Sequence, residues 1–219
     1  MKNLGHLIHG SDHSASADSV TIGTPRIYEA FTRLMFLGRR RGIYRRLVAA
    51  SGAKPGDRVI DVGCGTGYFS RLLGTTVGST GAVVGIDAAP EMVEYAASHA
   101  RGSANCDFKV GTAESLPVAS GTADVVVCAL VLHHLPPEVQ SAAASEMRRV
   151  LRTGGAALIA DLEVMAPGYG TRLFLRVTGL SHMRRHAPAL EPLLAAAGFR
   201  DVRTGRSGEL LGYARGVNP

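Results

Sequence analysis

Short apolar runs alternate with longer amphipathic segments along most of this chain, and that alternation predicts an α/β fold. Five apolar runs have the length of buried parallel strands and lie near residues 58–62, 82–86, 107–110, 124–129 and 156–161. Helical periodicity falls between them, near residues 67–77, 90–101 and 138–151. Two further helices, near 25–37 and 40–51, precede the first strand, and we expect them to cover the sheet.

The C-terminal part predicts more helix and then a hairpin. The segment from Thr171 has helical character, and Pro188–Ala197 predicts a short helix that ends at Gly198. Two strands are expected after it, Arg200–Arg206 and Glu209–Ala214, with Ser207 and Gly208 between them. We therefore expect a single domain over residues 1–219, composed of an N-terminal helical cover (1–50), a core (51–161), a lid segment (162–190) and a C-terminal helix and hairpin (191–219).

The first predicted strand ends in the sequence VIDVGCGTGYFS, residues 59–70. Here Asp61 is followed by glycines at 63, 65 and 67, where the strand must turn into a helix. Glycine permits a positive φ and lets a ligand approach the main chain. A dinucleotide fingerprint needs Gly-x-Gly-x-x-Gly and binds a pyrophosphate, which Asp61 would repel. The motif therefore favours a cationic ligand, although a structural tight turn could use the same residues.

A second acid, Asp87, ends the next predicted strand 26 positions after Asp61. This is the length of one strand, one crossover helix and a second strand. The carboxyl ends of parallel strands share one edge of the sheet, where ligands of open α/β folds bind. Asp87 could bind ribose hydroxyls or could only cap a helix that begins near Pro90. The Asp61 motif on the neighbouring strand favours the ribose role.

Four ordered segments carry a family resemblance: VIDVGCGTGYFS, VVGIDAAPEMVEYA, GTAESLPVASGTADVVVCALVLHHLP and EMRRVLRTGG. The series resembles that of class I S-adenosylmethionine-dependent methyltransferases, in the small-molecule branch that includes the ubiquinone/menaquinone-type enzymes. The resemblance covers residues 40–161 and is loose beyond them. It implies a Rossmann-like sheet of seven mostly parallel strands with helices on both faces and an antiparallel C-terminal strand. It further implies S-adenosyl-L-methionine as cofactor and in-line methyl transfer, C- or O-directed, to a small-molecule acceptor.

The resemblance also implies cofactor-binding roles for the residues that match its motifs. The methionine end would lie against Asp61, Gly63, Cys64, Gly65 and Gly67. Asp87 would bind the ribose, and the adenine would lie near Ala88, Met92, Gly111, Thr112 and Ala113. The sulfonium would face Ala129 and Leu130. The chain departs from its relatives at Thr112, where many have Asp, which could weaken the affinity or give Glu114 a substitute role, and at Thr153, where Pro is usual.

Candidates for catalysis follow the fourth predicted strand. His133 and His134 could act as general bases if the acceptor must lose a proton, although such a pair can also be structural. Tyr28, Asp161 and Glu163 are further candidates.

The acceptor would lie against residues 1–50 and 162–190, whose apolar side chains suit an apolar or amphipathic metabolite but could equally only seal the lid. Two other functions stay open: a nicotinamide-dependent oxidoreductase, and a cofactor-binding module without catalysis.

Composition narrows the class of protein. The chain of 219 residues is 46% hydrophobic, which suits one packed domain. Its longest apolar run, Val125–Leu132, is too short to span a membrane. The first residues lack an apolar stretch long enough for a secretory signal, so we expect a cytoplasmic location. Cys64, Cys106 and Cys128 are scattered, which predicts neither a disulfide framework nor a metal site.

The net charge of +6 comes almost entirely from arginine. Its densest run is Arg39, Arg40 and Arg41, followed by Arg45 and Arg46. Such a helix could contact an anionic membrane surface weakly, or it could pack on the sheet with its arginines in water. Nucleic acid is not an expected partner, because no aromatic stacking platform accompanies the charge.

Overall fold

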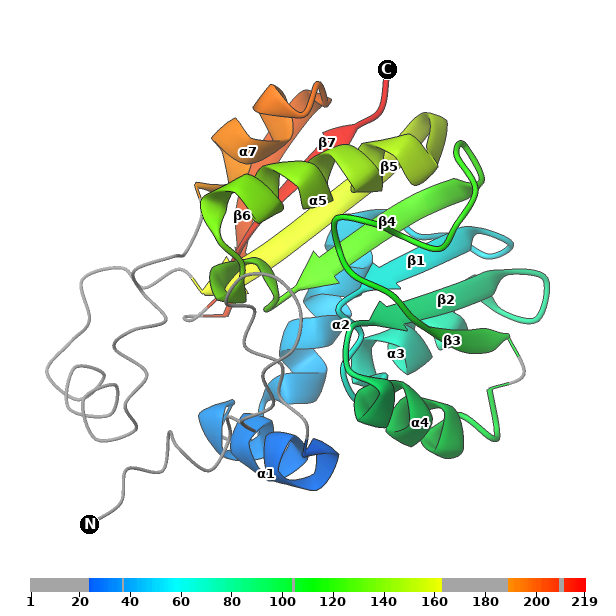
Figure 1. The fold of residues 1–219 in the computed structure, drawn as a ribbon. Helices are drawn as coiled ribbons and strands as arrows, with labels where there is room; N and C mark the ends of the chain where they lie inside the picture. The colour runs from blue at the N-terminus through cyan, green and yellow to red at the C-terminus, as the bar shows by residue number, and fades with distance from the viewer. Residues whose placement is uncertain (1–23, 37, 104, 163–188, 209–210) are drawn as a thin grey trace, which may run out of the picture.

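A computed structural model describes residues 24–36, 38–103, 105–162, 189–208 and 211–219. Seven strands form one sheet in the order β3-β2-β1-β4-β5-β7-β6 (Figure 1). Strands β1 to β5 are parallel, whereas β7 is antiparallel to both of its neighbours, β5 and β6. Their bounds are β1 Arg58–Val62, β2 Ala82–Asp87, β3 Cys106–Val110, β4 Ala123–Ala129, β5 Leu151–Leu162, β6 Arg200–Ser207 and β7 Leu211–Val217. The predicted Rossmann-like sheet with its antiparallel C-terminal strand is confirmed.

Helices cover both faces of this sheet, because successive residues of the buried strands point to opposite sides. Val59 packs with side chains of α2 and α3, whereas Ile60 packs with side chains of α5 and α7. In Figure 1, α5 crosses the near face of the sheet. The helices are α1 Pro25–Met35, α2 Arg40–Ser51, α3 Tyr68–Val77, α4 Pro90–His99, α5 Pro137–Val150 and α7 Leu190–Ala196, with a short 3₁₀ turn, η2, at Leu132–His134.

Two strands differ from their predicted bounds. The fifth strand was expected to begin at residue 156, but β5 begins at Leu151, directly after α5. Leu151 pairs with Ala123, and the ladder resumes at Ala156 beyond a register shift where Gly154 has a φ of +79°. The last strand was expected over 209–214, whereas β7 continues to Val217 because it pairs along β5 as far as Ala156. The predicted helix from Thr171 and residues 163–188 of the predicted lid segment lie outside the described residues.

The three thiols are free: Cys64 and Cys128 are buried and Cys106 is partly exposed. Within the described ranges, no set of three or more His, Cys, Asp and Glu side chains could hold a metal ion. Among those same residues, no helix is both long enough and apolar enough to cross a bilayer.

Candidate active site

The turn between β1 and α3 is built on glycine. Gly63, Gly65 and Gly67 have φ values of +68°, +50° and +71°. The backbone N–H groups of Gly63 and Cys64 both donate to the Ile86 carbonyl of β2, at 2.7 and 3.0 Å. This conformation is strained for any residue with a Cβ. The turn therefore holds its backbone close to the carboxyl end of β2, and its glycines take the positive φ values that the sequence pattern predicted.

Space is as restrictive as φ at Gly63. A Cβ there would lie 2.2 Å from Cγ2 of Val131, whereas a Cβ at Gly121, with the same φ of +68°, would meet nothing within 4 Å. Gly121→Ala should cost only the strain of a positive φ, about 1–2 kcal/mol. Gly63→Ala should cost about 1–3 kcal/mol more, because it also overpacks the Val131 side chain. Urea unfolding of the two variants measures the difference, and equal losses would contradict the steric part of this prediction.

Asp87 ties the two strand ends together. One carboxylate oxygen, Oδ2, accepts the N–H of Gly65 at 2.8 Å, and the other, Oδ1, accepts the N–H of Ala89 at 3.0 Å. Burial raises its pKa, while the three backbone hydrogen bonds from Ala89, Gly65 and Ala88 lower it. The cap residue of α4 is Ala89, so Asp87 is not the helix cap that the sequence left open. Its carboxylate lies at the glycine turn, where the predicted ribose role requires it.

Asp87→Ala should weaken binding of S-adenosylhomocysteine by about 1.5–3 kcal/mol, the range for hydrogen bonds to a charged group. Calorimetric titration of the variant measures this loss. Asp107→Ala is the matched control, because Asp107 is an exposed carboxylate on the neighbouring strand β3. An unchanged dissociation constant in Asp87→Ala would remove this residue from the binding site.

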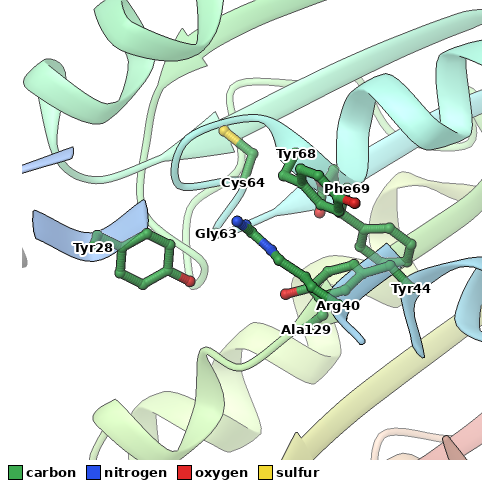
Figure 2. A pocket seen from close by; sticks show the side chains of 9 residues that line it. Tyr28, Arg40, Tyr44, Gly63, Cys64, Tyr68, Phe69 and Ala129 are labelled. Carbon is green, nitrogen blue, oxygen red and sulfur yellow. The ribbon is translucent and has the colours of Figure 1, made fainter. Parts of the chain in front are cut away.

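A small cavity lies beside the turn, beneath the N-terminal helices (Figure 2). Its lining includes four residues predicted to bind the cofactor, Asp61, Gly63, Cys64 and Ala129. The other lining residues are Tyr28 from α1, Arg40 and Tyr44 from α2, and Tyr68 and Phe69 from α3. The structure thus brings the predicted methionine subsite together with residues from both helices of the cover.

Asp61 is 1% exposed, and its Oδ2 accepts the Ser70 hydroxyl at 2.6 Å. Burial raises the pKa of Asp61 to about 7; the Ser70 hydrogen bond opposes this rise and the Asp87 charge adds to it. A buried carboxylate of this kind gains most from a cationic ligand, since an opposite charge stabilises its ionised form. The structure thus gives a physical basis for the cationic preference that the sequence motif predicted.

The residues predicted around the adenine lie along the ends of β2 and β3. Gly111 donates its N–H to the Asp87 carbonyl at 3.0 Å, which places it next to the predicted ribose ligand. Thr112 is exposed and forms an isolated bridge with Ser115, and Ala113 is half-buried. Ala88 is exposed, while Met92 is buried in α4. Their contacts with the adenine stay predictions.

Leu130 has a φ of +62°, a left-handed conformation that is rare for a branched apolar residue. It directly follows Ala129 of the cavity wall and is 8% exposed. Its N–H donates to the Ala160 carbonyl of β5 at 2.8 Å, which helps to hold this conformation. Strain of this kind concentrates at functional sites, so the backbone at the end of β4 fits the role predicted for Ala129 and Leu130 beside the sulfonium.

Beyond β4, His133 and Asp161 form a buried pair. Nδ1 of His133 lies 2.5 Å from Oδ1 of Asp161, and the His133 backbone N–H donates to Oδ2 at 3.0 Å. Both side chains are 1% exposed. Because the carboxylate accepts the Nδ1 proton, Nε2 of a neutral ring carries the lone pair. This Nε2 is buried and has no hydrogen-bond partner among the described residues.

The other catalytic candidates have different surroundings. His134 is half-buried, with its ring centroid 3.9 Å from that of His133. Tyr28 lines the cavity, and burial raises its pKa to about 12, which disfavours it as a base near neutral pH. Glu163 lies outside the described residues. Among the described candidates, a buried hydrogen bond joins His133 to Asp161.

Arg40 corrects one expectation from the sequence. It was placed with Arg39 and Arg41 in a basic surface patch, but it is only 8% exposed, whereas its two neighbours are exposed. The guanidinium lies 4.0 Å from the Tyr68 ring centroid, and Nη1 donates to Oε2 of Glu29 at 2.8 Å. The signal was present in the helix register, because Arg40 precedes the buried Tyr44 by four positions on the same face.

Known proteins are similar in sequence to the core of this chain. Residues 59–155 match the family described as a methyltransferase domain. The ubiquinone/menaquinone biosynthesis C-methyltransferase UbiE of Xanthomonas campestris is 34% identical over 157 residues, 70% of this chain and 61% of that protein. The arsenite methyltransferase of Halobacterium salinarum is 38% identical over 115 residues, 52% of this chain and 29% of that protein. The chain thus spans less than two thirds of the length of either relative.

The fold is shared with solved structures as well. A S-adenosylmethionine-dependent methyltransferase from Aquifex aeolicus superposes with a TM-score of 0.64 at 22% identity, over 90% of this chain and 99% of that chain. The matched region contains the glycine turn, both strand-end acids and the His133 segment. Residues 59–155 of this chain are therefore similar to a methyltransferase domain, and the described elements have the fold of a solved S-adenosylmethionine-dependent methyltransferase.

Proposed function

We propose that this protein methylates a small, largely apolar phenol or hydroquinone, and that His133 accepts the hydroxyl proton of this acceptor. The observation that carries the proposal is Nε2 of His133, a buried nitrogen without a partner among the described residues. A buried polar atom that lacks a hydrogen bond is rare in folded proteins and calls for a ligand or a catalytic role. Asp161 supports that role because it orients the ring and fixes the proton on Nδ1.

The residues present fit the cofactor. The glycine turn leaves its backbone accessible, Asp61 offers a buried carboxylate to an ammonium group, and Asp87 offers one to ribose hydroxyls. When bound, S-adenosylmethionine supplies a methyl group that a sulfonium already activates for displacement. The chain therefore has to position the acceptor, exclude water and remove a proton.

His133 would take the proton from the acceptor hydroxyl onto Nε2, and the resulting imidazolium would be stabilised by Asp161. The electron pair freed on the oxygen can form the new bond to carbon there. It can also do so at the adjacent ring carbon, because the two are conjugated; that carbon then loses its hydrogen to solvent as a proton, and the oxygen recovers a proton from His133, which restores the aromatic ring. A base at this position therefore serves both O- and C-methylation. The relative from Xanthomonas campestris, a C-methyltransferase of ubiquinone/menaquinone biosynthesis, supports an acceptor of the quinone class.

Two measurements test this function. Calorimetry should detect saturable binding of S-adenosylhomocysteine, and mass spectrometry should detect a methylated product with a 2-alkyl-1,4-naphthohydroquinone. The dimethyl ether of the same ring is the matched control, because it has no hydroxyl proton to give. Tight cofactor binding without transfer to any phenol or hydroquinone tested would instead indicate a binding module. Absence of S-adenosylhomocysteine binding would contradict the proposed function altogether.

A further inference from the structure

A second buried nitrogen without a partner lies in the cavity itself. Among the described residues, only Nε of Arg40 and Nε2 of His133 are buried side-chain nitrogens or oxygens without a hydrogen bond. Arg40 lines the same cavity as Asp61 and Gly63, and Figure 2 shows its guanidinium reaching from α2 to the glycine turn. Burying a charged group with an unused donor is costly unless a ligand completes its hydrogen bonds. The guanidinium therefore calls for an acceptor inside the cavity.

The surroundings of Arg40 occupy part of its guanidinium and leave Nε for such an acceptor. Nη1 is bonded to Glu29, Tyr44 also shares a side-chain hydrogen bond with Arg40, and the rings of Tyr44 and Tyr68 lie within 5.6 and 4.0 Å of the Arg40 Cζ atom. Nε shares the opposite edge of the planar group with Nη2. Two parallel N–H donors of this kind match the two oxygens of a carboxylate, which they bind bidentately.

Charges of both signs line this cavity. Asp61 offers a carboxylate from the core, and Arg40 offers a guanidinium from the cover. An α-amino acid group carries an ammonium and a carboxylate on adjacent atoms, so it complements both side chains at once. We propose that Arg40 binds the α-carboxylate of the methionine half of the cofactor, while Asp61 binds its α-ammonium. This inference rests on the proposed function and gives Arg40, a residue of the N-terminal cover, a role in binding the cofactor.

Glu29 positions the guanidinium of Arg40. Its Oε2 holds Nη1 of Arg40, while its Oε1 accepts the hydroxyl of Thr66 in the glycine turn. The same carboxylate thus links α1, α2 and the turn, and it fixes the direction in which the guanidinium points. The packing of α1 and α2 against the turn and the position of the guanidinium are therefore linked through this one side chain.

The test compares three nucleosides by calorimetry: S-adenosylhomocysteine, its decarboxylated analogue, which keeps the amine, and 5′-methylthioadenosine, which lacks the amino acid end. The wild-type protein should bind S-adenosylhomocysteine roughly 10- to 150-fold more tightly than the decarboxylated analogue. Arg40→Gln should reduce this preference to less than about threefold, by weakening S-adenosylhomocysteine alone. Arg41→Gln is the control, because Arg41 is an exposed neighbour on the same helix. Arg40→Lys keeps the charge but loses the two parallel N–H donors, so its preference for S-adenosylhomocysteine over the decarboxylated analogue should be intermediate.

Each other outcome has a defined meaning. If Arg40→Gln weakens all three nucleosides equally, Arg40 is structural and the proposal is wrong. The same holds if wild-type protein binds S-adenosylhomocysteine and its decarboxylated analogue equally, a comparison that needs no variant to fold. If Arg40→Gln leaves nucleoside binding unchanged but raises KM for carboxylated acceptors only, the carboxylate belongs to the acceptor and the proposal is again wrong. Failure of wild-type protein to bind S-adenosylhomocysteine would instead contradict the proposed function.

Discussion

Replacing His133 by glutamine should lower kcat with a hydroquinone acceptor by roughly 10²- to 10⁴-fold, the usual contribution of a positioned general base. Glutamine keeps hydrogen-bonding capacity beside Asp161 but cannot accept a proton near neutral pH. The dissociation constant of S-adenosylhomocysteine should change less than about twofold, because His133 is not among the residues that line the cofactor cavity. Steady-state kinetics together with calorimetry separates the two quantities.

Two further variants sharpen this result. Asp161→Asn should also lower kcat, because Asp161 holds Nδ1 of His133 and a neutral amide no longer selects the Nε2 lone pair. His99→Gln is the control, since His99 is an exposed histidine at the end of α4. If His133→Gln keeps the wild-type kcat, the unpartnered Nε2 has no role in proton transfer and the acceptor does not need this base.

Affinity for S-adenosylhomocysteine should rise as the pH increases towards about 7 and then level off. Burial raises the pKa of Asp61 to about 7, so the empty site holds a proton below that pH. The ligand ammonium favours the ionised carboxylate, and binding therefore releases this proton. The dissociation constant should fall by up to about tenfold per pH unit below pH 7. Calorimetry in buffers of different ionisation enthalpy measures both the affinity and the released proton.

Asp61→Asn should remove this pH dependence and weaken binding by about 3–5 kcal/mol, because it leaves a buried ammonium without a counter-charge. Asp87 is a half-buried acid of raised pKa facing the same turn, so Asp87→Asn is the necessary comparison. If the pH dependence survives in Asp61→Asn and disappears in Asp87→Asn, the released proton comes from Asp87, and the prediction for Asp61 is wrong.

Stability of the empty protein should depend on pH in the opposite direction. The pKa of Asp61 is near its ordinary value of 3.8 in the unfolded chain, but burial raises it to about 7 in the folded protein. Between these values the folded state binds the additional proton, so the free energy of unfolding falls as the pH rises from about 4 to about 7. Urea unfolding at several pH values should show this decline, and Asp61→Asn should flatten it.

The strand-end acids could be predicted from the sequence because local spacing decides their place. Asp61 and Asp87 each end an apolar run, and parallel strands separated by one helix bring such ends to one edge. The contact between His133 and Asp161 could not be predicted in the same way. It depends on the pairing of β4 with β5, in which Ala129 lies opposite Ala160. His133 and Asp161 were therefore separate candidates before this register was known.

Arg40 shows why contacts between charged residues on different helices could not be predicted from the sequence. A run of three arginines has the appearance of a solvated surface; the spacing of Arg40 to Tyr44 indicates its inner face, but its contacts at the glycine turn depend on the position of α2 in the fold. Its partner Glu29 lies on another helix, 11 positions away. The acceptor site is still harder to predict from the sequence, because the segment expected to enclose it, residues 162–190, carries no motif from which a contact could be inferred.

The position of β7 has a consequence for how the sheet is completed. This strand is inserted between β5 and β6, so β6 is connected to the rest of the sheet only through β7. A nascent chain that has not yet released residues 211–217 from the ribosome leaves β5 with an open edge, although its segment Ala156–Asp161 is buried in the finished protein. Open, apolar strand edges promote aggregation. Truncation near residue 210 would leave this edge open, and we expect it to promote aggregation during expression.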